Sequence, residues 1–142
     1  MIKITSVKKN EYFSLMKIEE SIFEKHVFTD KLKTYFNEGP IKIWKISTTK
    51  IIGFVIFYHI QDEVEIIQIG IIKPYQRKNY GTLIINKIKK LNIKKIFLEV
   101  SVKNSKAINF YLKNGFKKIG IREGYYEGSK YKIDALRLLF EF

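Results

Sequence analysis

A run of apolar residues at 51–58, Ile-Ile-Gly-Phe-Val-Ile-Phe-Tyr, limits the folds that are open to this chain. Successive side chains of a β-strand point to opposite faces of the sheet, so a strand built from this run is apolar on both faces. Such a strand is stable in the middle of a sheet that helices cover on both sides. The run is too short for a membrane span, which needs roughly 20 residues. We therefore expect a soluble α/β fold without a membrane segment.

Two neighbouring segments extend the sheet from this run. Residues 41–47 and 63–72 have the composition of strands, and short polar connections join them to the run as an antiparallel meander. An amphipathic helix then opens at Gly81, and another strand follows at 94–100. A right-handed crossover through this helix makes the strand at 94–100 parallel to the strand at 63–72. A ligand cleft is expected at the carboxyl ends of these two parallel strands.

The other segments complete the predicted fold. Further strands are expected at residues 2–6, 116–122 and 131–142, with a loop at 124–128. Further helices are expected with N-caps at Asn10, at Thr29 and at Asn104 or Ser105, and Gly115 ends the last of them. The prediction is one domain over residues 1–142: a mixed, mostly antiparallel sheet of about seven strands, with helices on both faces and a cleft between two parallel strands.

The segment between the first parallel strand and its helix has the features of a phosphate site. The backbone N–H groups at a helix start are unpaired and carry the positive end of the helix dipole. Arg77 and Lys78 lie beside Gly81 in this segment, so a pyrophosphate group would be well accommodated. The glycine spacing alone is equally compatible with an ordinary turn from strand to helix.

Composition restricts the classes of function. The chain has 27 Lys and Arg against 14 Asp and Glu, a net charge of +13, which favours anionic partners such as nucleic acid or a polyphosphate cofactor. An AT-rich genome would also produce many lysines. Cysteine is absent, which excludes disulfides and a covalent cysteine intermediate. The two histidines, His26 and His59, are more typical of structural positions, so no metal site is expected. The N-terminus lacks the apolar core of a signal peptide, so a cytoplasmic protein is expected.

Glu99 is the candidate acid or base at the predicted cleft. Alternation places Phe97, Glu99 and Ser101 on one face of their strand, where bulky groups surround the carboxylate. A general base is one interpretation of this position, and the solvated face of a half-exposed strand is the other. Tyr111, one helix later, has the spacing of a core aromatic residue.

The motifs that follow resemble a known superfamily. Gln76-Arg77-Lys78-Asn79-Tyr80-Gly81 resembles the Gln/Arg-x-x-Gly-x-Gly/Ala motif of the Gcn5-related N-acetyltransferases (GNATs). The segments with matching order and spacing are Leu98-Glu99-Val100, Asn104, Ala107-Ile108, Tyr111 and Asn114-Gly115-Phe116. Arg122, Tyr125-Tyr126 and Asp134-Ala135 are similar to the ribosomal-protein alanine N-acetyltransferases, which modify protein α-amino groups.

The resemblance implies a site for acetyl-CoA as co-substrate. The backbone at Ile69, Gly70 and Ile71 would pair with the pantetheine arm, and Gly70 would let that backbone kink. An N–H group near Ile71 would polarise the thioester carbonyl. The residues expected at the pyrophosphate are Gln76, Arg77, Lys78, Asn79, Tyr80 and Gly81, with Asn104 on the other side of the cofactor. Asn79 departs from the motif glycine, and its short amide tolerates the positive φ that this glycine would supply.

The resemblance also implies roles in catalysis and in acceptor binding. Glu99 would deprotonate the acceptor ammonium, and the Tyr111 phenol would protonate the departing thiolate. Phe28, Tyr125 and Tyr126 would contact the acceptor. The leading interpretation is acetylation of a protein N-terminus, with association with the ribosome as a further expectation. The alternatives are a GNAT that modifies a small amine or a lysine side chain, and a basic ribosome- or RNA-binding module without activity.

Overall fold

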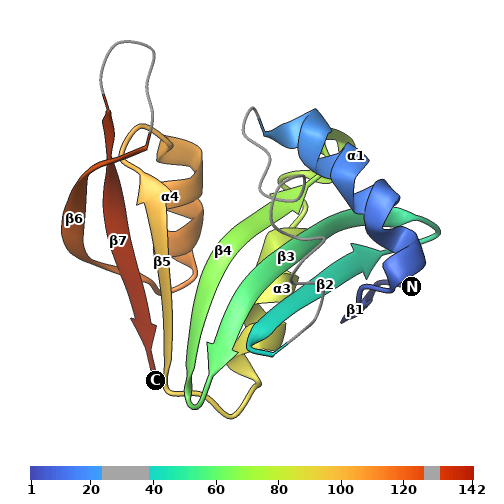
Figure 1. Ribbon diagram of the computed structural model, residues 1–142, viewed down its shortest axis with the longest axis horizontal. Coiled ribbons are helices and arrows are strands. Elements are labelled where there is room, and N and C mark those ends of the chain that lie inside the picture. The colour runs from blue at the N-terminus through green and yellow to red at the C-terminus, as the bar shows by residue number, and fades with distance from the viewer. Residues whose placement is uncertain (24–38, 127–131) are drawn as a thin grey trace.

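The computed structural model describes residues 1–23, 39–126 and 132–142, which form a seven-stranded sheet and the helices that cover it (Figure 1). The strands are β1 (Lys3–Ser6), β2 (Ile41–Ser47), β3 (Ile51–Ile60), β4 (Glu63–Ile71), β5 (Lys95–Ser101), β6 (Lys117–Tyr126) and β7 (Ile133–Glu141). The helices are α1 (Tyr12–Ile22), α3 (Tyr80–Lys89) and α4 (Ser105–Lys113), with 3-10 turns η1 (Lys9–Glu11) and η2 (Lys73–Tyr75). None of the described helices is long and apolar enough to cross a membrane.

The strand order is β1-β2-β3-β4-β5-β7-β6. Neighbouring strands from β1 to β4 are antiparallel, as are β5, β7 and β6. The pair β4 and β5 is parallel, joined through α3. The expected mixed, mostly antiparallel sheet is therefore confirmed, and so is the parallel crossover.

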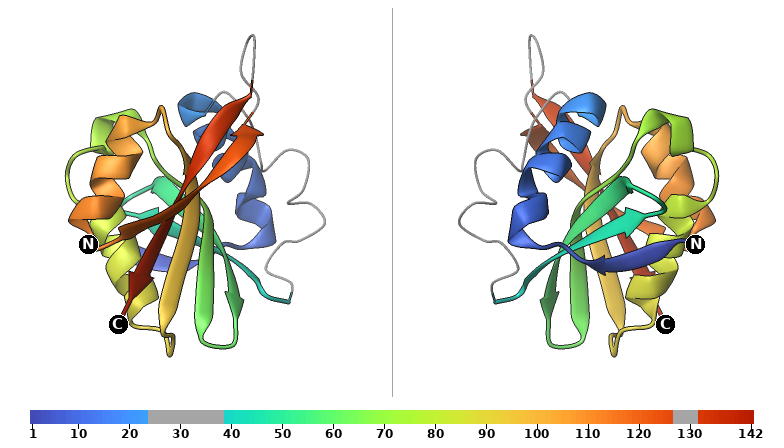
Figure 2. Two further views of the ribbon diagram at one scale, coloured as in Figure 1. Left: turned by 90° about the vertical axis from the view of Figure 1, so that its left-hand side faces the viewer. Right: turned by 90° about the vertical axis from the view of Figure 1, so that its right-hand side faces the viewer.

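Helices cover both faces of the sheet, as the apolar run in β3 requires. Figure 2 shows α1 on one face and α3 and α4 on the other. Phe54 and Ile56 pack into the core beneath α1, whereas Val55 and Phe57 pack into the core beneath α3 and α4. All four side chains are buried, so the central strand contributes to both cores.

The start of α1 differs from the prediction. Asn10 does not cap the helix, because it lies inside the 3-10 turn η1. Glu11 fixes this turn instead, since its Oε1 atom accepts a hydrogen bond of 2.9 Å from the Lys8 N–H. The helix expected from Thr29 lies outside the described residues.

The C-terminal half confirms one predicted cap and corrects a strand boundary. Asn104 caps α4, with its Oδ1 atom 3.2 Å from the Ala107 amide nitrogen, and Gly115 after the helix has a φ of 91°. Strand β6 continues to Tyr126, so Tyr125 and Tyr126 end a strand and do not belong to the loop predicted there. The strand is longer because its pairing with β7 resumes at Tyr126, after an irregular stretch that follows Arg122.

Candidate active site

Strands β4 and β5 separate at their carboxyl ends. Their parallel ladder runs only from Glu63 paired with Lys95 to Ile66 paired with Leu98. Beyond that point β4 stays paired with β3 as far as Ile71, and β5 stays paired with β7 as far as its own end (Figure 1). On its other side, which faces β5, the part of β4 at residues 67–71 has no ladder partner among the described residues. This side of the strand is therefore a free edge. Such an edge can pair with an extended ligand as if it were another strand.

A β-bulge produces this separation, at a different residue from the one predicted. The register of β4 with β3 shifts between Ile66 and Gln68, which leaves Ile67 as the extra residue. The kink expected at Gly70 is therefore wrong in position. Gly70 allows two aromatic rings to pack against the strand, because a Cβ atom there would lie 3.0 Å from the Phe23 ring and 3.2 Å from the Phe54 ring. Bulges bend a strand and end its pairing, which accounts for the divergence of β4 from β5.

The segment after β4 contains two residues in left-handed conformations, one on each side of Lys78. Asn79 has a φ of 67° and a ψ of 13°, so the positive φ predicted at this position is confirmed. Arg77 has a φ of 61°, which the sequence did not indicate. Gln76 fixes the segment to the strand, because its Nε2 group donates a hydrogen bond of 2.7 Å to the Ile71 carbonyl. Backbone turns of this kind direct successive N–H groups into one concavity that suits an anion.

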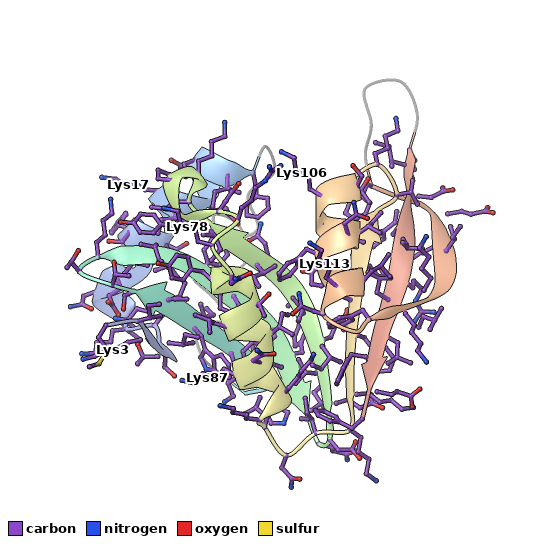
Figure 3. All side chains as sticks on the ribbon, turned by 180° about the vertical axis from the view of Figure 1, so that it is seen from behind. Lys3, Lys17, Lys78, Lys87, Lys106 and Lys113 are labelled. Atoms are coloured by element: carbon purple, nitrogen blue, oxygen red, sulfur yellow. The ribbon has the colours of Figure 1, made fainter. Side chains whose placement is uncertain are left out.

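The start of α3 lacks a side-chain cap and has cations close by. Asn79 stands at the N-cap position without a side-chain cap, and the first helical turn holds no acidic residue. Figure 3 shows Lys78 at the start of α3 and Lys106 at the start of α4, toward the same end of the molecule. Gly81 permits a close approach of the two helices, since a Cβ atom there would lie 2.9 Å from the Phe110 ring. This end of the molecule therefore offers helix amides and cations together.

Glu99 lies on β5 just beyond the last residue paired with β4. Its side chain is 18% exposed and lies between two guanidinium groups. Arg122 Nη1 lies 3.4 Å from one carboxylate oxygen, and Arg137 Nε lies 3.6 Å from the other. Arg137 is the cross-strand partner of Glu99 on β7. Both cations therefore lie within ion-pair distance of the carboxylate.

Tyr126 and Tyr111 both have phenol groups with raised pKa values. The Tyr126 hydroxyl donates a hydrogen bond of 3.2 Å to the Glu99 carbonyl oxygen. Burial raises the pKa of Tyr126 to about 12, and electrostatic repulsion from Tyr125 and Glu99 adds to the rise. Burial also raises the pKa of Tyr111 far above its ordinary value, with a further contribution from Tyr126. Both phenols therefore stay protonated at neutral pH, as a proton donor must.

Tyr111 is also the core aromatic residue that its spacing indicated. It is 5% exposed, and its ring packs edge-on against Phe110 and Phe116, at centroid distances of 5.1 and 5.4 Å. A structural role and a role as an acid are compatible here.

A pocket of about 260 Å³ opens beside Glu99 on the sheet face opposite α3 and α4. Its lining includes Tyr58, Glu65, Phe97, Glu99, Ile119 and Arg137. The sequence analysis missed this pocket, because five strands contribute to it and their relative register cannot be read from one sequence. It also missed Arg137, for which the only signal was its place in the last strand. Phe28, the other predicted acceptor contact, lies outside the described residues.

Comparison with known proteins identifies the family. The model of the acetyltransferase (GNAT) family matches residues 10–116. The chain belongs to the GNAT acetyltransferase family. Its curated relatives include a [ribosomal protein bS18]-alanine N-acetyltransferase from Haemophilus influenzae, 29% identical over 127 residues that cover 87% of this chain and 86% of the relative.

Solved structures agree with this assignment. The crystal structure of the ribosomal-protein-S18-alanine N-acetyltransferase from Escherichia coli superposes with a TM-score of 0.83 and 26% identity, covering 99% of this chain and 94% of that one. A spermidine N-acetyltransferase from Vibrio cholerae, in complex with CoA and spermine, has a TM-score of 0.80 at 19% identity, covering 99% of this chain and 95% of that one. The second likeness concerns the fold alone. The GNAT fold of this chain is thus established, and its activity is that of an N-acetyltransferase.

GNAT enzymes use acetyl-CoA, and the residues of this chain fit that molecule. The β4 edge at residues 67–71 offers backbone groups to an extended amide chain. The uncapped start of α3 and the positive φ angles of Arg77 and Asn79 suit a pyrophosphate. Asn104 uses its Oδ1 atom for the α4 cap, which leaves its Nδ2 amide group to donate elsewhere.

Proposed function

We propose that this GNAT transfers the acetyl group of acetyl-CoA to the N-terminal α-amino group of a protein. The observation that carries the proposal is the position of Glu99, a carboxylate at the divergence of β4 and β5 with an open pocket beside it. The chain is similar to a ribosomal-protein alanine N-acetyltransferase over 86% of that protein's length, which supports an α-amine as the acceptor. A ribosomal protein is accordingly the first acceptor to test, and the cytoplasm the expected location.

The cofactor would lie along β4 and across the start of α3. Ile69, Gly70 and Ile71 would pair with the pantetheine arm, and an amide near Ile71 would polarise the thioester carbonyl. The residues proposed at the pyrophosphate are Gln76, Arg77, Lys78, Asn79, Tyr80 and Gly81, with Asn104 on the other side. Bound acetyl-CoA supplies an acetyl group activated as a thioester.

The chain itself would move two protons. Glu99 accepts a proton from the acceptor ammonium, directly or through a water molecule, which makes the amine nucleophilic. Tyr111, which stays protonated because burial raises its pKa, donates a proton to the departing thiolate. The acceptor nitrogen releases its second proton to solvent as the amide forms, and solvent reprotonates Tyr111. Transfer is direct between the two bound substrates, in agreement with the absence of cysteine from the chain.

The acceptor would approach on the sheet face that carries Glu99. Tyr125 and Tyr126 end β6 beside this carboxylate and are proposed to contact the acceptor backbone, together with Phe28. A polyamine is the second candidate acceptor, because Glu63 and Glu65 line the same pocket as Glu99 and would attract a second ammonium group.

A panel of acceptors incubated with acetyl-CoA and analysed by mass spectrometry tests the proposal. Peptides that begin with Ala are expected to gain one acetyl group at the α-amine. Their matched controls are the same peptides with a blocked N-terminus and one internal lysine, which are expected to remain unmodified. Modification of lysine side chains or of spermidine, with the free N-terminal peptides unchanged, would reject the α-amine in favour of the alternatives.

A further inference from the structure

Arg122 contacts both oxygen atoms of the Glu99 carboxylate. Its Nη1 atom lies 3.5 Å from Oε1 and 3.4 Å from Oε2. The Arg122 side chain is 57% exposed, so water competes with this ion pair and the isolated interaction is weak. An exposed arginine also has many rotamers, and it stays in one of them only where something else restrains it.

The ring of Tyr125 provides that restraint. The guanidinium carbon of Arg122 lies 4.3 Å from the centre of this ring, within the range of a cation–π contact. An irregular stretch of β6 between Arg122 and Tyr126 brings the ring into this place. Gly124 lies in that stretch with a φ of 60°, and its N–H donates a hydrogen bond of 2.9 Å to Asp134.

Tyr126 completes the link between the end of β6 and the base. Its ring contacts the Tyr125 ring edge-on at 4.8 Å, and its hydroxyl binds the Glu99 carbonyl oxygen. The end of β6 therefore contacts Glu99 at the side chain through Arg122 and at the backbone through Tyr126. Arg137 reaches the same carboxylate from β7, but no ring contact restrains it within the described part of the chain.

We propose that Arg122 is a positioning residue, which Tyr125 holds by stacking and which in turn orients the Glu99 carboxylate toward the acceptor amine. The inference rests on the proposed function, because it takes Glu99 to be the base. It gives Tyr125 an effect on the chemical step in addition to its proposed contact with the acceptor. Tyr125 is 47% exposed, which leaves part of its surface for that contact.

A double-mutant cycle in kcat tests the inference. Arg122→Gln and Tyr125→Leu should each lower kcat by about two- to fivefold, from the loss of one exposed ion pair and one cation–π contact respectively, with the KM for acetyl-CoA unchanged. The double variant should be no slower than Arg122→Gln alone, because Tyr125 acts on the carboxylate only through Arg122. Tyr125→Phe keeps the ring, so its kcat should exceed that of Tyr125→Leu, and Arg122→Lys should recover part of the loss.

Arg137→Gln combined with Tyr125→Leu is the matched control. Arg137→Gln also removes an arginine from the Glu99 carboxylate. Its effect on kcat should multiply with that of Tyr125→Leu, because Tyr125 acts through Arg122 and not through Arg137. The inference would be overturned if the effects of Arg122→Gln and Tyr125→Leu on kcat multiplied in the double variant. It would also be overturned if Tyr125→Leu raised the KM for the acceptor and left kcat unchanged. If those effects multiply while Glu99→Gln still lowers the rate strongly near neutral pH, only this inference fails. Full activity of Glu99→Gln would reject both this inference and the proposed base.

Discussion

Replacing Glu99 with Gln is expected to lower the rate of acetyl transfer by about 10²- to 10⁴-fold near neutral pH, the usual contribution of general acid–base catalysis. Glutamine keeps the size and planarity of the side chain but cannot accept the proton. The acceptor amine is an ammonium ion at neutral pH and must lose a proton before it can attack. As the pH rises toward the pKa of the amine, solvent removes this proton, so the activity of the variant should partly recover.

Tyr111→Phe should behave differently across the same pH range. Burial raises the pKa of Tyr111, so the wild-type phenol stays protonated throughout the usable pH range and its loss cannot be compensated by a change of pH. The rate of this variant should be low at every pH. Initial rates of both variants between pH 6 and 10, with thermal melting as a control for folding, make the comparison. Rates within a few-fold of wild type for both would mean that positioning alone drives transfer.

Asn79→Val is expected to abolish binding of acetyl-CoA, whereas Asn79→Gly should change the affinity by less than tenfold. The backbone at this position has a φ of 67°, which glycine adopts freely and a β-branched residue resists. Valine would therefore shift the start of α3 and misdirect the amides proposed to bind the pyrophosphate. Calorimetric titration with acetyl-CoA measures both affinities.

Asn79→Ala separates the two possible contributions of the asparagine. Alanine removes the side-chain amide but tolerates positive φ better than valine, so its affinity should fall between those of the glycine and valine variants. Circular dichroism checks that α3 remains folded in each variant. Equal affinities of the glycine and valine proteins would show that the position makes no special demand on the backbone.

The sheet was predictable because its strands follow strong local patterns. The run in β3 is apolar on both faces, which requires helices on both sides, and the structure places α1 on one side and α3 and α4 on the other. The short connections fixed the antiparallel meander, and the crossover through α3 fixed the parallel pair. The positive φ at Asn79 was predictable from the resemblance, because few residues other than glycine tolerate it.

Features that depend on the pairing register of the strands could not be predicted from the sequence. The bulge at Ile67 adds one residue to β4, and nothing in an isoleucine-rich strand marks which residue is extra. Arg122 and Arg137 meet Glu99 only because β6 and β7 pair beside β5 in one particular alignment. At Asn10, a favourable capping residue misled the prediction, because Glu11 provided a competing hydrogen bond to the Lys8 amide.

The site of acetyl-CoA can be tested directly by hydrogen exchange of backbone amides, followed with and without saturating acetyl-CoA. Cofactor that lies along the free edge of β4 and across the start of α3 should slow exchange at residues 69–71 and 77–82. Exchange in β1 and β2, on the far side of the sheet, should not change and serves as the internal control. Unchanged exchange at residues 69–71 and 77–82, with acetyl-CoA bound and other segments protected, would contradict this account of the site.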